Sequence, residues 1–409
     1  MNTDLKVLML QLPQGQELRI LATSYDYRPR LGGIATFSYE VVHALREIPG
    51  VRVKLIAPIV KGWNEEEKDT LRLDLPSEAM QSIVPISIAV SREIISFSPH
   101  VILHFLWHPC GAASLLNSPL RWATHVPYFV FAYGVEILES PSTWKKWLRS
   151  KLIGLKQSVF RQAAGVFSIS KFTGAQLESA CRVEPSQIHP VYCGVSPEKF
   201  YPEPASARII EQYQLHGRRV LLTVSRLQDY KGIDRMLSAL RAVIKKHPDV
   251  VYLICGTGPD RSRLEALSLH YRVASHVIFT GPVSGDNLRE LYNSSEVFVL
   301  LSRTDWYAPN VEGFGLVYLE AAACGKPAIG SSHGGVPDAI EDGVSGWIVD
   351  PTNDDEIAST VINVLDHPEE IRKRGENARE RALRSFTWQH VAQRVLTPIL
   401  KKGGHRVRN

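Results

Sequence analysis

The sequence predicts an α/β fold with two doubly wound domains, and three observations lead to this prediction. The chain has 409 residues, which is too long for one compact core. Short apolar runs alternate with helical stretches, as in parallel βαβ units. Glycine-rich turns follow several of these runs, as in nucleotide-binding folds. Hydrophobic residues make up 44% and charged residues 22% of the chain, ordinary values for a globular protein.

Composition excludes several classes of protein. No apolar run approaches the roughly 20 residues that span a bilayer, and the N-terminal residues do not resemble a secretory signal. The five cysteines are scattered and form no C-x-x-C pair, so we expect neither a disulfide framework nor a zinc site, but reduced thiols in a cytoplasmic enzyme. The net charge of +5 is too small to indicate a nucleic-acid partner.

The first predicted domain begins with a strand, a glycine loop and a helix. The strand covers residues 18–23, Gly32 and Gly33 lie in the loop, and the helix covers residues 36–47. In a nucleotide-binding unit such glycines let the backbone approach a phosphate or an acceptor. Residues 1–17 are an extension to which we assign no role. Further elements follow along the domain: strands at 51–58, 101–105, 127–132 and 165–170, and a helix at 82–96.

A basic amphipathic helix is predicted at residues 142–164. This stretch contains no acidic residue, and its apolar residues recur at helical spacing. Such a helix can lie in an anionic membrane interface, with tryptophan at the level of the headgroups. Alternatively, its apolar side can pack on its own domain. The residues that would contact a membrane are Trp144, Lys145, Lys146, Trp147 and Arg149.

A stiff segment with Pro202 and Pro204 separates the two predicted domains. We therefore place the first domain at 1–203 and the second at 204–385, followed by a helix at 386–400 and a basic tail at 401–409. The second domain repeats the alternation of strands and helices, with strands at 220–224, 250–255, 277–280, 296–301 and 327–330.

Two cations follow the first strand of the second domain. Arg226 comes directly after this strand, and Lys231 lies five residues further along. At the carboxyl edge of a parallel sheet, both would face the region where doubly wound sheets bind ligands. Arginine offers phosphate a planar fork of donors, and lysine offers a point charge. Either cation alone could be an ordinary surface residue, but together with the rest of the pattern they favour a phosphate-binding site.

The segment 310–330 carries the strongest chemical signal. Two glutamates flank a Gly-Phe-Gly turn and the start of a helix. The N–H groups at a helix N-terminus attract phosphate, whereas carboxylates beside phosphate would be repelled unless they bind hydroxyl groups. A ligand with both phosphate and sugar hydroxyls, a nucleotide sugar, satisfies both conditions. The predicted binding residues are Glu312, Gly313, Phe314, Gly315, Leu316 and Glu320.

This segment resembles the signature of the family 4 retaining glycosyltransferases, which have the GT-B fold. The resemblance covers residues 18–400 and is most specific in 222–235 and 310–350. It implies two Rossmann-like domains that face a cleft, the first for the acceptor and the second for the nucleotide sugar. It also implies that the last helix returns to the first domain.

The resemblance assigns roles to the residues that match the family pattern. Arg226 and Lys231 would clamp the donor diphosphate in place of a metal, and Glu312 would hold hydroxyls of the donor sugar. Glu320 would bind the ribose hydroxyls. The other donor-binding candidates are backbone positions, namely Gly32, Gly33, Gly256, Pro282 and Val283.

One position departs from the family pattern. Relatives often carry a histidine near the reacting sugar, where this chain has Tyr133. A tyrosine can still donate a hydrogen bond to a sugar hydroxyl, so Tyr133 remains a catalytic candidate. Glu136 is the neighbouring carboxylate, with an acceptor-side role and an ordinary loop position equally open.

The resemblance implies a hexosyltransferase that retains anomeric configuration and needs no metal cofactor. Because the segment 310–350 most resembles bacterial lipid mannosyltransferases, we expect GDP-mannose as the preferred donor, with a UDP-sugar as the other possibility, and a lipid or glycan as the acceptor. We expect the enzyme in the cytoplasm, either free or peripheral on the cytoplasmic face of the membrane. The alternatives are a non-hydrolysing nucleotide-sugar epimerase of GT-B fold and a catalytically inactive nucleotide-sugar sensor.

Overall fold

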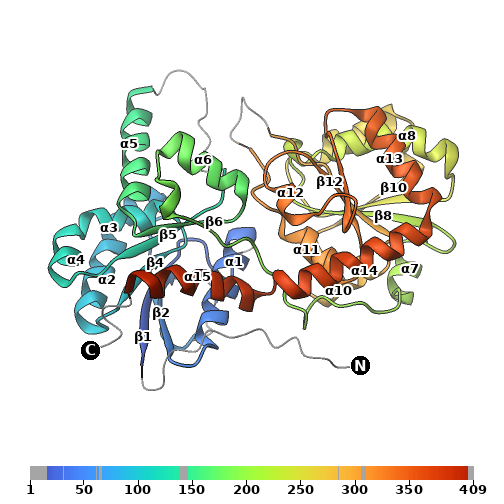
Figure 1. Cartoon of the computed structure of the whole chain (residues 1–409). Coiled ribbons are helices and arrows are strands. Elements are labelled where there is room, and N and C mark those ends of the chain that lie inside the picture. The colour runs from blue at the N-terminus through green and yellow to red at the C-terminus, as the bar shows by residue number, and fades with distance from the viewer. Residues whose placement is uncertain are drawn as a thin grey trace. The chain divides into compact units, whose positions relative to one another are not determined.

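The computed structural model describes residues 16–30, 32–60, 62–63, 67–135, 137, 146–283, 285–304 and 310–403. The chain divides into two compact units (Figure 1). The first unit combines Met1–Cys193 with Trp388–Asn409, and the second is Gly194–Thr387.

The first unit is built on a seven-stranded parallel sheet of order β3-β2-β1-β4-β5-β6-β7. All five residues of β5 are buried apolar or aromatic residues, as expected where helices cover both faces of a parallel sheet. The strands are β1 (Leu18–Thr23), β2 (Val51–Pro58), β3 (Thr70–Leu73), β4 (Val101–His104), β5 (Tyr128–Ala132), β6 (Gly165–Ser168) and β7 (Ile188–Pro190).

Helices pack on both faces of this first sheet (Figure 1). On one face, Phe37 packs against Phe131 and Trp388, with ring centroids 5.2 and 5.7 Å apart. On the other face, four helices contribute to one apolar core. The helices are α1 (Gly33–Arg46) and α15 (Trp388–Gly403) on the first face, α2 (Ile83–Ser96), α3 (Ala112–Leu116), α5 (Lys146–Gln162) and α6 (Lys171–Cys181) on the second, and α4 (Ser118–Thr124), which contacts α2 and α3.

The second unit contains a six-stranded parallel sheet of order β10-β9-β8-β11-β12-β13. The strands are β8 (Arg219–Val224), β9 (Val250–Cys255), β10 (Val277–Gly281), β11 (Val297–Leu300), β12 (Ala328–Ser331) and β13 (Gly346–Val349). Its helices are α7 (Ala207–Gln212), α8 (Ile233–Lys246), α9 (Arg261–His270), α10 (Asp286–Asn293), α11 (Leu316–Ala323), α12 (Val336–Ala339), α13 (Asp354–Asp366) and α14 (Pro368–Ser385).

Apolar side chains cover both faces of the second sheet. Residues of α8, α9 and α13 form one core with the sheet. On the opposite face, Phe298 of β11 contacts Tyr292 of α10 and Tyr318 of α11, with centroids 5.9 and 5.4 Å apart. The predicted α/β fold with two doubly wound sheets is therefore confirmed.

The last helix packs within the first unit. Trp388 of α15 makes an edge contact with Phe37 of α1, and the two helices lie against each other. The return of this helix to the first unit is therefore confirmed. None of the described helices combines the length and the apolar character needed to cross a bilayer.

Candidate donor site at the carboxyl edge of the second sheet

The second sheet has a switch point between β8 and β11. β9 and β10 lie on one side of β8, whereas β11, β12 and β13 lie on the other. In doubly wound sheets the loops after the two central strands diverge at such a point, and ligands bind in the crevice that they leave. Arg226 and Lys231 follow β8, and Glu312 follows β11. The three side chains predicted to act on the donor thus come from the two loops that define the switch point.

Lys231 and Glu312 contact each other directly. The Lys231 Nζ donates a hydrogen bond to Glu312 Oε2 over 2.6 Å, and the two side chains are only 12% and 14% exposed. Ser302 Oγ donates to the same carboxylate oxygen over 3.3 Å. Burial lowers the pKa of Lys231, but Glu312 and Tyr230 together more than offset it, so the pKa ends above its ordinary value. Lys231 is therefore an ammonium ion at neutral pH.

The loop that carries Lys231 is held against the end of β11. The Arg303 N–H donates to the Tyr230 carbonyl over 2.7 Å, and the Arg303 guanidinium donates to Asp234 over 2.8 Å. Gly232 has a φ of +70°, and a Cβ there would overlap the Leu301 carbonyl. Only glycine fits this close approach. These contacts fix the position of the ammonium group relative to β11.

The backbone of Glu312 is fixed by a second glycine loop. The Gly335 N–H donates to the Glu312 carbonyl over 2.9 Å, and Gly334 adopts a φ of +64° directly against that carbonyl. Gly315, with a φ of +90°, precedes the first residue of α11, Leu316. The glutamate and the helix start are thereby held at the same edge of the sheet.

Glu320 lies further along α11 and contacts a neighbouring helix. Tyr292 of α10 donates a hydrogen bond to Glu320 Oε2 over 2.8 Å. Burial raises the pKa of Glu320 to about 7, although the Tyr292 hydrogen bond opposes this increase. Near neutral pH this carboxyl group therefore exchanges between a neutral form and an anion that accepts hydrogen bonds.

Arg226 differs from Lys231 in its surroundings. Its side chain is exposed, and the structure records no ion pair or hydrogen bond from it to another described residue. An arginine without a counterion beside the switch point is available to an anionic ligand. The predicted pair of cations therefore consists of one exposed guanidinium and one buried ammonium group.

The remaining donor-side candidates lie at the ends of the neighbouring strands. Gly256 follows β9 with a φ of +137°, and a Cβ there would overlap the Ser225 carbonyl at the end of β8. Pro282 and Val283 follow β10, two strands away from β8. The structure thus brings Lys231 and Glu312 into contact and places Gly256, Pro282 and Val283 along the same sheet edge.

Several candidates belong to the first unit. Gly32 is exposed and Gly33 begins α1. Tyr133 follows β5, is 7% exposed and meets the Phe37 ring edge-on at 5.6 Å. Glu136 lies outside the described residues. Of the membrane-contact candidates, Trp144 and Lys145 also lie outside them, and only the backbone of Lys146, Trp147 and Arg149 is described, as part of α5.

The structure adds residues that the sequence patterns do not single out. Ser302 follows β11 and contacts Glu312, and Tyr292 contacts Glu320 from another helix. His108 follows β4 in the first unit; its Nε2 is buried and has no hydrogen-bond partner among the described residues, and burial lowers its pKa. Position just after a strand is the available signal for Ser302, whereas no local pattern marks His108 or Tyr292.

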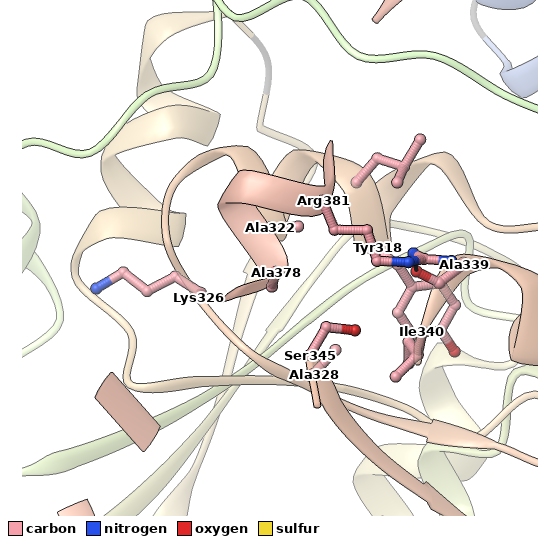
Figure 2. A pocket seen from close by; sticks show the side chains of 10 residues that line it. Tyr318, Ala322, Lys326, Ala328, Ala339, Ile340, Ser345, Ala378 and Arg381 are labelled. Atoms are coloured by element: carbon pink, nitrogen blue, oxygen red, sulfur yellow. Dashed lines mark hydrogen bonds between the residues drawn. The ribbon is translucent and has the colours of Figure 1, made fainter. Parts of the chain in front are cut away.

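A small cavity behind α11 is too small for the donor. It lies between α11, β12 and α14, with a volume of about 10 Å³ (Figure 2). A cavity of this size holds at most about one water molecule. Among the described residues, no group of three or more His, Cys, Asp or Glu side chains is placed to hold a metal ion.

The two halves of the chain match two families of known proteins. Residues 206–381 match the family described as glycosyl transferases group 1, and residues 31–199 match glycosyltransferase family 4. A GDP-mannose-dependent alpha-(1-6)-phosphatidylinositol monomannoside mannosyltransferase from Mycolicibacterium smegmatis is 29% identical over 384 residues, which are 92% of this chain and 97% of the relative.

Solved structures share the fold. Sucrose-phosphate synthase from Thermosynechococcus elongatus has a TM-score of 0.78 at 21% identity, covering 95% of this chain and 100% of that one. Anabaena Alr3699/HepE, solved in complex with UDP and glucose, has a TM-score of 0.72 at 16% identity, covering 94% of this chain and 100% of that one.

Proposed function

The chain belongs to the family 4 glycosyltransferases of GT-B fold, and we propose that this hexosyltransferase moves mannose from GDP-mannose to a hydroxyl group of a lipid or glycan. The M. smegmatis relative, which aligns over 92% of this chain, is named as a GDP-mannose-dependent mannosyltransferase with a phosphatidylinositol monomannoside acceptor. The observation that carries the proposal is the contact between Lys231 and Glu312 at the switch point. It places a cation suited to phosphate beside a carboxylate suited to sugar hydroxyls.

Transfer breaks the bond between the anomeric carbon and the diphosphate, and negative charge builds on the departing phosphate oxygen. Fixed positive charges near that oxygen stabilise the transition state more than the ground state. We assign this role to Lys231 and Arg226. Glu312, which already accepts a hydrogen bond from Lys231, would accept further hydrogen bonds from the hydroxyls of the donor sugar.

The stereochemical course is part of the proposal. We propose that the sugar keeps its anomeric configuration because the acceptor attacks from the face that the diphosphate leaves, and the departing phosphate takes the proton of the acceptor hydroxyl. The new bond joins the acceptor oxygen to the anomeric carbon, and the nucleoside diphosphate leaves with the proton. In this route no glutamate forms a covalent intermediate, and Tyr133 would orient a sugar hydroxyl.

A thermal-shift screen of sugar nucleotides tests the choice of donor. A ligand at 100 times its dissociation constant stabilises a protein by about 2.7 kcal/mol, and at equal concentration the ligand that binds more tightly stabilises more. GDP-mannose should therefore raise the unfolding temperature more than UDP-glucose or UDP-N-acetylglucosamine. A larger shift with a UDP-sugar would replace mannose by another hexose; Alr3699/HepE, a fold relative, was solved with UDP and glucose. Incubating labelled donor without acceptor separates the epimerase alternative, which would return an epimerised donor.

We expect transfer to continue in the presence of EDTA. Arg226 and Lys231 supply the positive charge that a divalent cation supplies to diphosphates in other enzymes. The measurement is the initial rate after dialysis against EDTA, compared with the rate after Mg²⁺ or Mn²⁺ is added back. A rate that disappears with EDTA and returns with metal would contradict the expectation.

Donor binding should strengthen as the pH rises from 6 to 8. The pKa of Glu320 lies at about 7, and the ionised carboxylate accepts hydrogen bonds from ribose hydroxyls more strongly than the neutral acid, which has one donor in place of an acceptor site. If only this form binds, the affinity for GDP-mannose should increase about tenfold over the interval. The diphosphate of GDP-mannose carries no terminal phosphate that titrates in this range, so the change reports on the protein.

The Glu320→Gln variant is the control for this pH dependence, because an amide does not ionise. Titration calorimetry should give the variant a weak, nearly constant affinity between pH 6 and 8. A wild-type affinity that is flat or falls with pH would contradict the assignment of Glu320 to the ribose.

A further inference from the structure

Exposed apolar side chains gather on three neighbouring helices of the first unit, α2, α3 and α4. Val84, Ile88 and Ile95 of α2 are 56%, 57% and 71% exposed, and their spacing of four and seven residues places them on one side of the helix. Leu116 of α3 is 57% exposed and Trp122 of α4 is 69% exposed. The three helices contact one another and lie together beside the first sheet (Figure 1). We call these five residues the α2–α4 surface.

The exposed apolar residues of α2 lie on the side of the helix opposite to the one that packs in the core. Ile86, Val90 and Ile94 are 1%, 0% and 3% exposed and pack in the core of the first unit. A surface helix of a globular protein normally carries polar residues opposite its buried stripe. Single exposed apolar residues are common and need no explanation. Apolar residues grouped on the outer side of a helix, in contrast, indicate that this side meets a second apolar environment.

The charges around the α2–α4 surface favour an anionic partner. The only carboxylate between residues 79 and 125 is Glu93, which is 8% exposed and accepts a hydrogen bond from Lys54 over 2.7 Å. α5 contacts α3, and its sequence contains lysine and arginine but no acidic residue. Lipid phosphates would therefore meet no exposed carboxylate on α2, α3 or α4.

We propose that the α2–α4 surface inserts into the interface of an anionic lipid bilayer. The aliphatic side chains would enter the acyl region, whereas Trp122, whose indole combines an apolar ring with a hydrogen-bond donor, would lie at the level of the headgroups. This surface is distinct from the basic helix α5, which would add electrostatic attraction. The proposal does not depend on the choice of donor sugar, because binding to vesicles is measured without turnover.

A fluorophore at the surface tests insertion directly. All five native cysteines are buried, so the Ile95→Cys variant can be labelled selectively with an environment-sensitive dye. Vesicles of phosphatidylcholine and phosphatidylglycerol in equal parts should shift its emission to the blue. The matched control is Leu269→Cys on α9 of the second unit, where Leu269 is 69% exposed, close to the 71% of Ile95. An unshifted dye at position 95, or an equal shift at position 269, would overturn the proposal.

Sedimentation with the same vesicles measures the energetic contribution. The variant carrying Ile95→Ser and Trp122→Ser should lose about tenfold in partitioning for each side chain, because burial of one such side chain is worth at least that factor. Leu269→Ser should leave partitioning unchanged. Binding by apolar insertion should persist at about 0.5 M salt, where surface charge is strongly screened. Binding that vanishes at this salt concentration would overturn the proposal. Binding that is lost only when Lys146 and Arg149 are neutralised, and not with the serine variant, would also overturn it.

A second copy of the chain is the competing occupant of this surface. Light scattering of the full-length protein without lipid decides between the two. A monomer that binds vesicles supports the proposal. A dimer that the paired serine substitutions dissociate, in a protein that does not bind vesicles, would overturn it. Both substitutions lie at exposed positions, so unfolding temperatures matching the wild type should confirm that the variants are folded.

Discussion

Replacing Lys231 by alanine is expected to lower kcat/KM for transfer by at least about a hundredfold, the scale of losing one fixed donor that stabilises a developing anion. The ammonium group is buried, is held within 2.6 Å of Glu312 and belongs to a loop packed against β11. Such a group needs little rearrangement to meet the leaving phosphate. Because its contribution grows as the bond breaks, the loss should be mainly in kcat.

Stability must be separated from catalysis in this variant, because Lys231→Ala leaves the largely buried Glu312 carboxylate without its ion-pair partner. An unpaired buried charge destabilises a fold. Adding Glu312→Gln removes that charge and should restore the unfolding temperature without restoring transfer. The matched control is Lys245→Ala, an exposed lysine on α8, which should leave both quantities unchanged. If the activity of Lys231→Ala lies within threefold of the wild type, Lys231 does not stabilise the leaving phosphate.

Arg226→Ala should lose transfer to a similar extent, about a hundredfold or more, but with no loss of stability. Arg226 is exposed and has no recorded partner among the described residues, so its removal breaks no contact that supports the fold, and the free energy of unfolding should change by less than about 0.5 kcal/mol. The measurements are steady-state kinetics and chemical denaturation of the same preparation.

Arg226→Lys refines this prediction. Lysine keeps the charge but lacks the planar fork that contacts two phosphate oxygens at once, so its activity should lie between those of the wild type and the alanine variant. The control is Arg241→Ala, an exposed arginine on α8. A fully active Arg226→Ala enzyme would restrict the diphosphate contact to Lys231 and the backbone.

The sequence predicts the fold well where elements are long or strongly apolar. The strand Leu18–Thr23 and the start of the helix at Leu316 match the structure, because buried parallel strands and glycine-bounded helices have strong local patterns. The edge strand Thr70–Leu73 is absent from the prediction. All four of its residues are only partly buried, so it lacks the continuous apolar run of a central strand.

The sequence predicts which residues belong to the candidate site, but it does not predict the contacts between them. Sequence spacing places Lys231 and Glu312 in loops that follow two different strands. Only the strand order β9-β8-β11 makes those loops neighbours and lets the two side chains form an ion pair. Glu320 shows the same limit, because Tyr292, which modifies its pKa, belongs to a different helix that no local pattern connects with it.

The most direct test of the central claim is a crystal structure of the protein soaked with GDP-mannose. We expect diphosphate oxygens within hydrogen-bonding distance of both the Arg226 guanidinium and the Lys231 Nζ, with mannose hydroxyls on Glu312 and ribose hydroxyls on Glu320. A nucleotide bound away from the carboxyl edge of the second sheet, or bound there without contact to either cation, would contradict it.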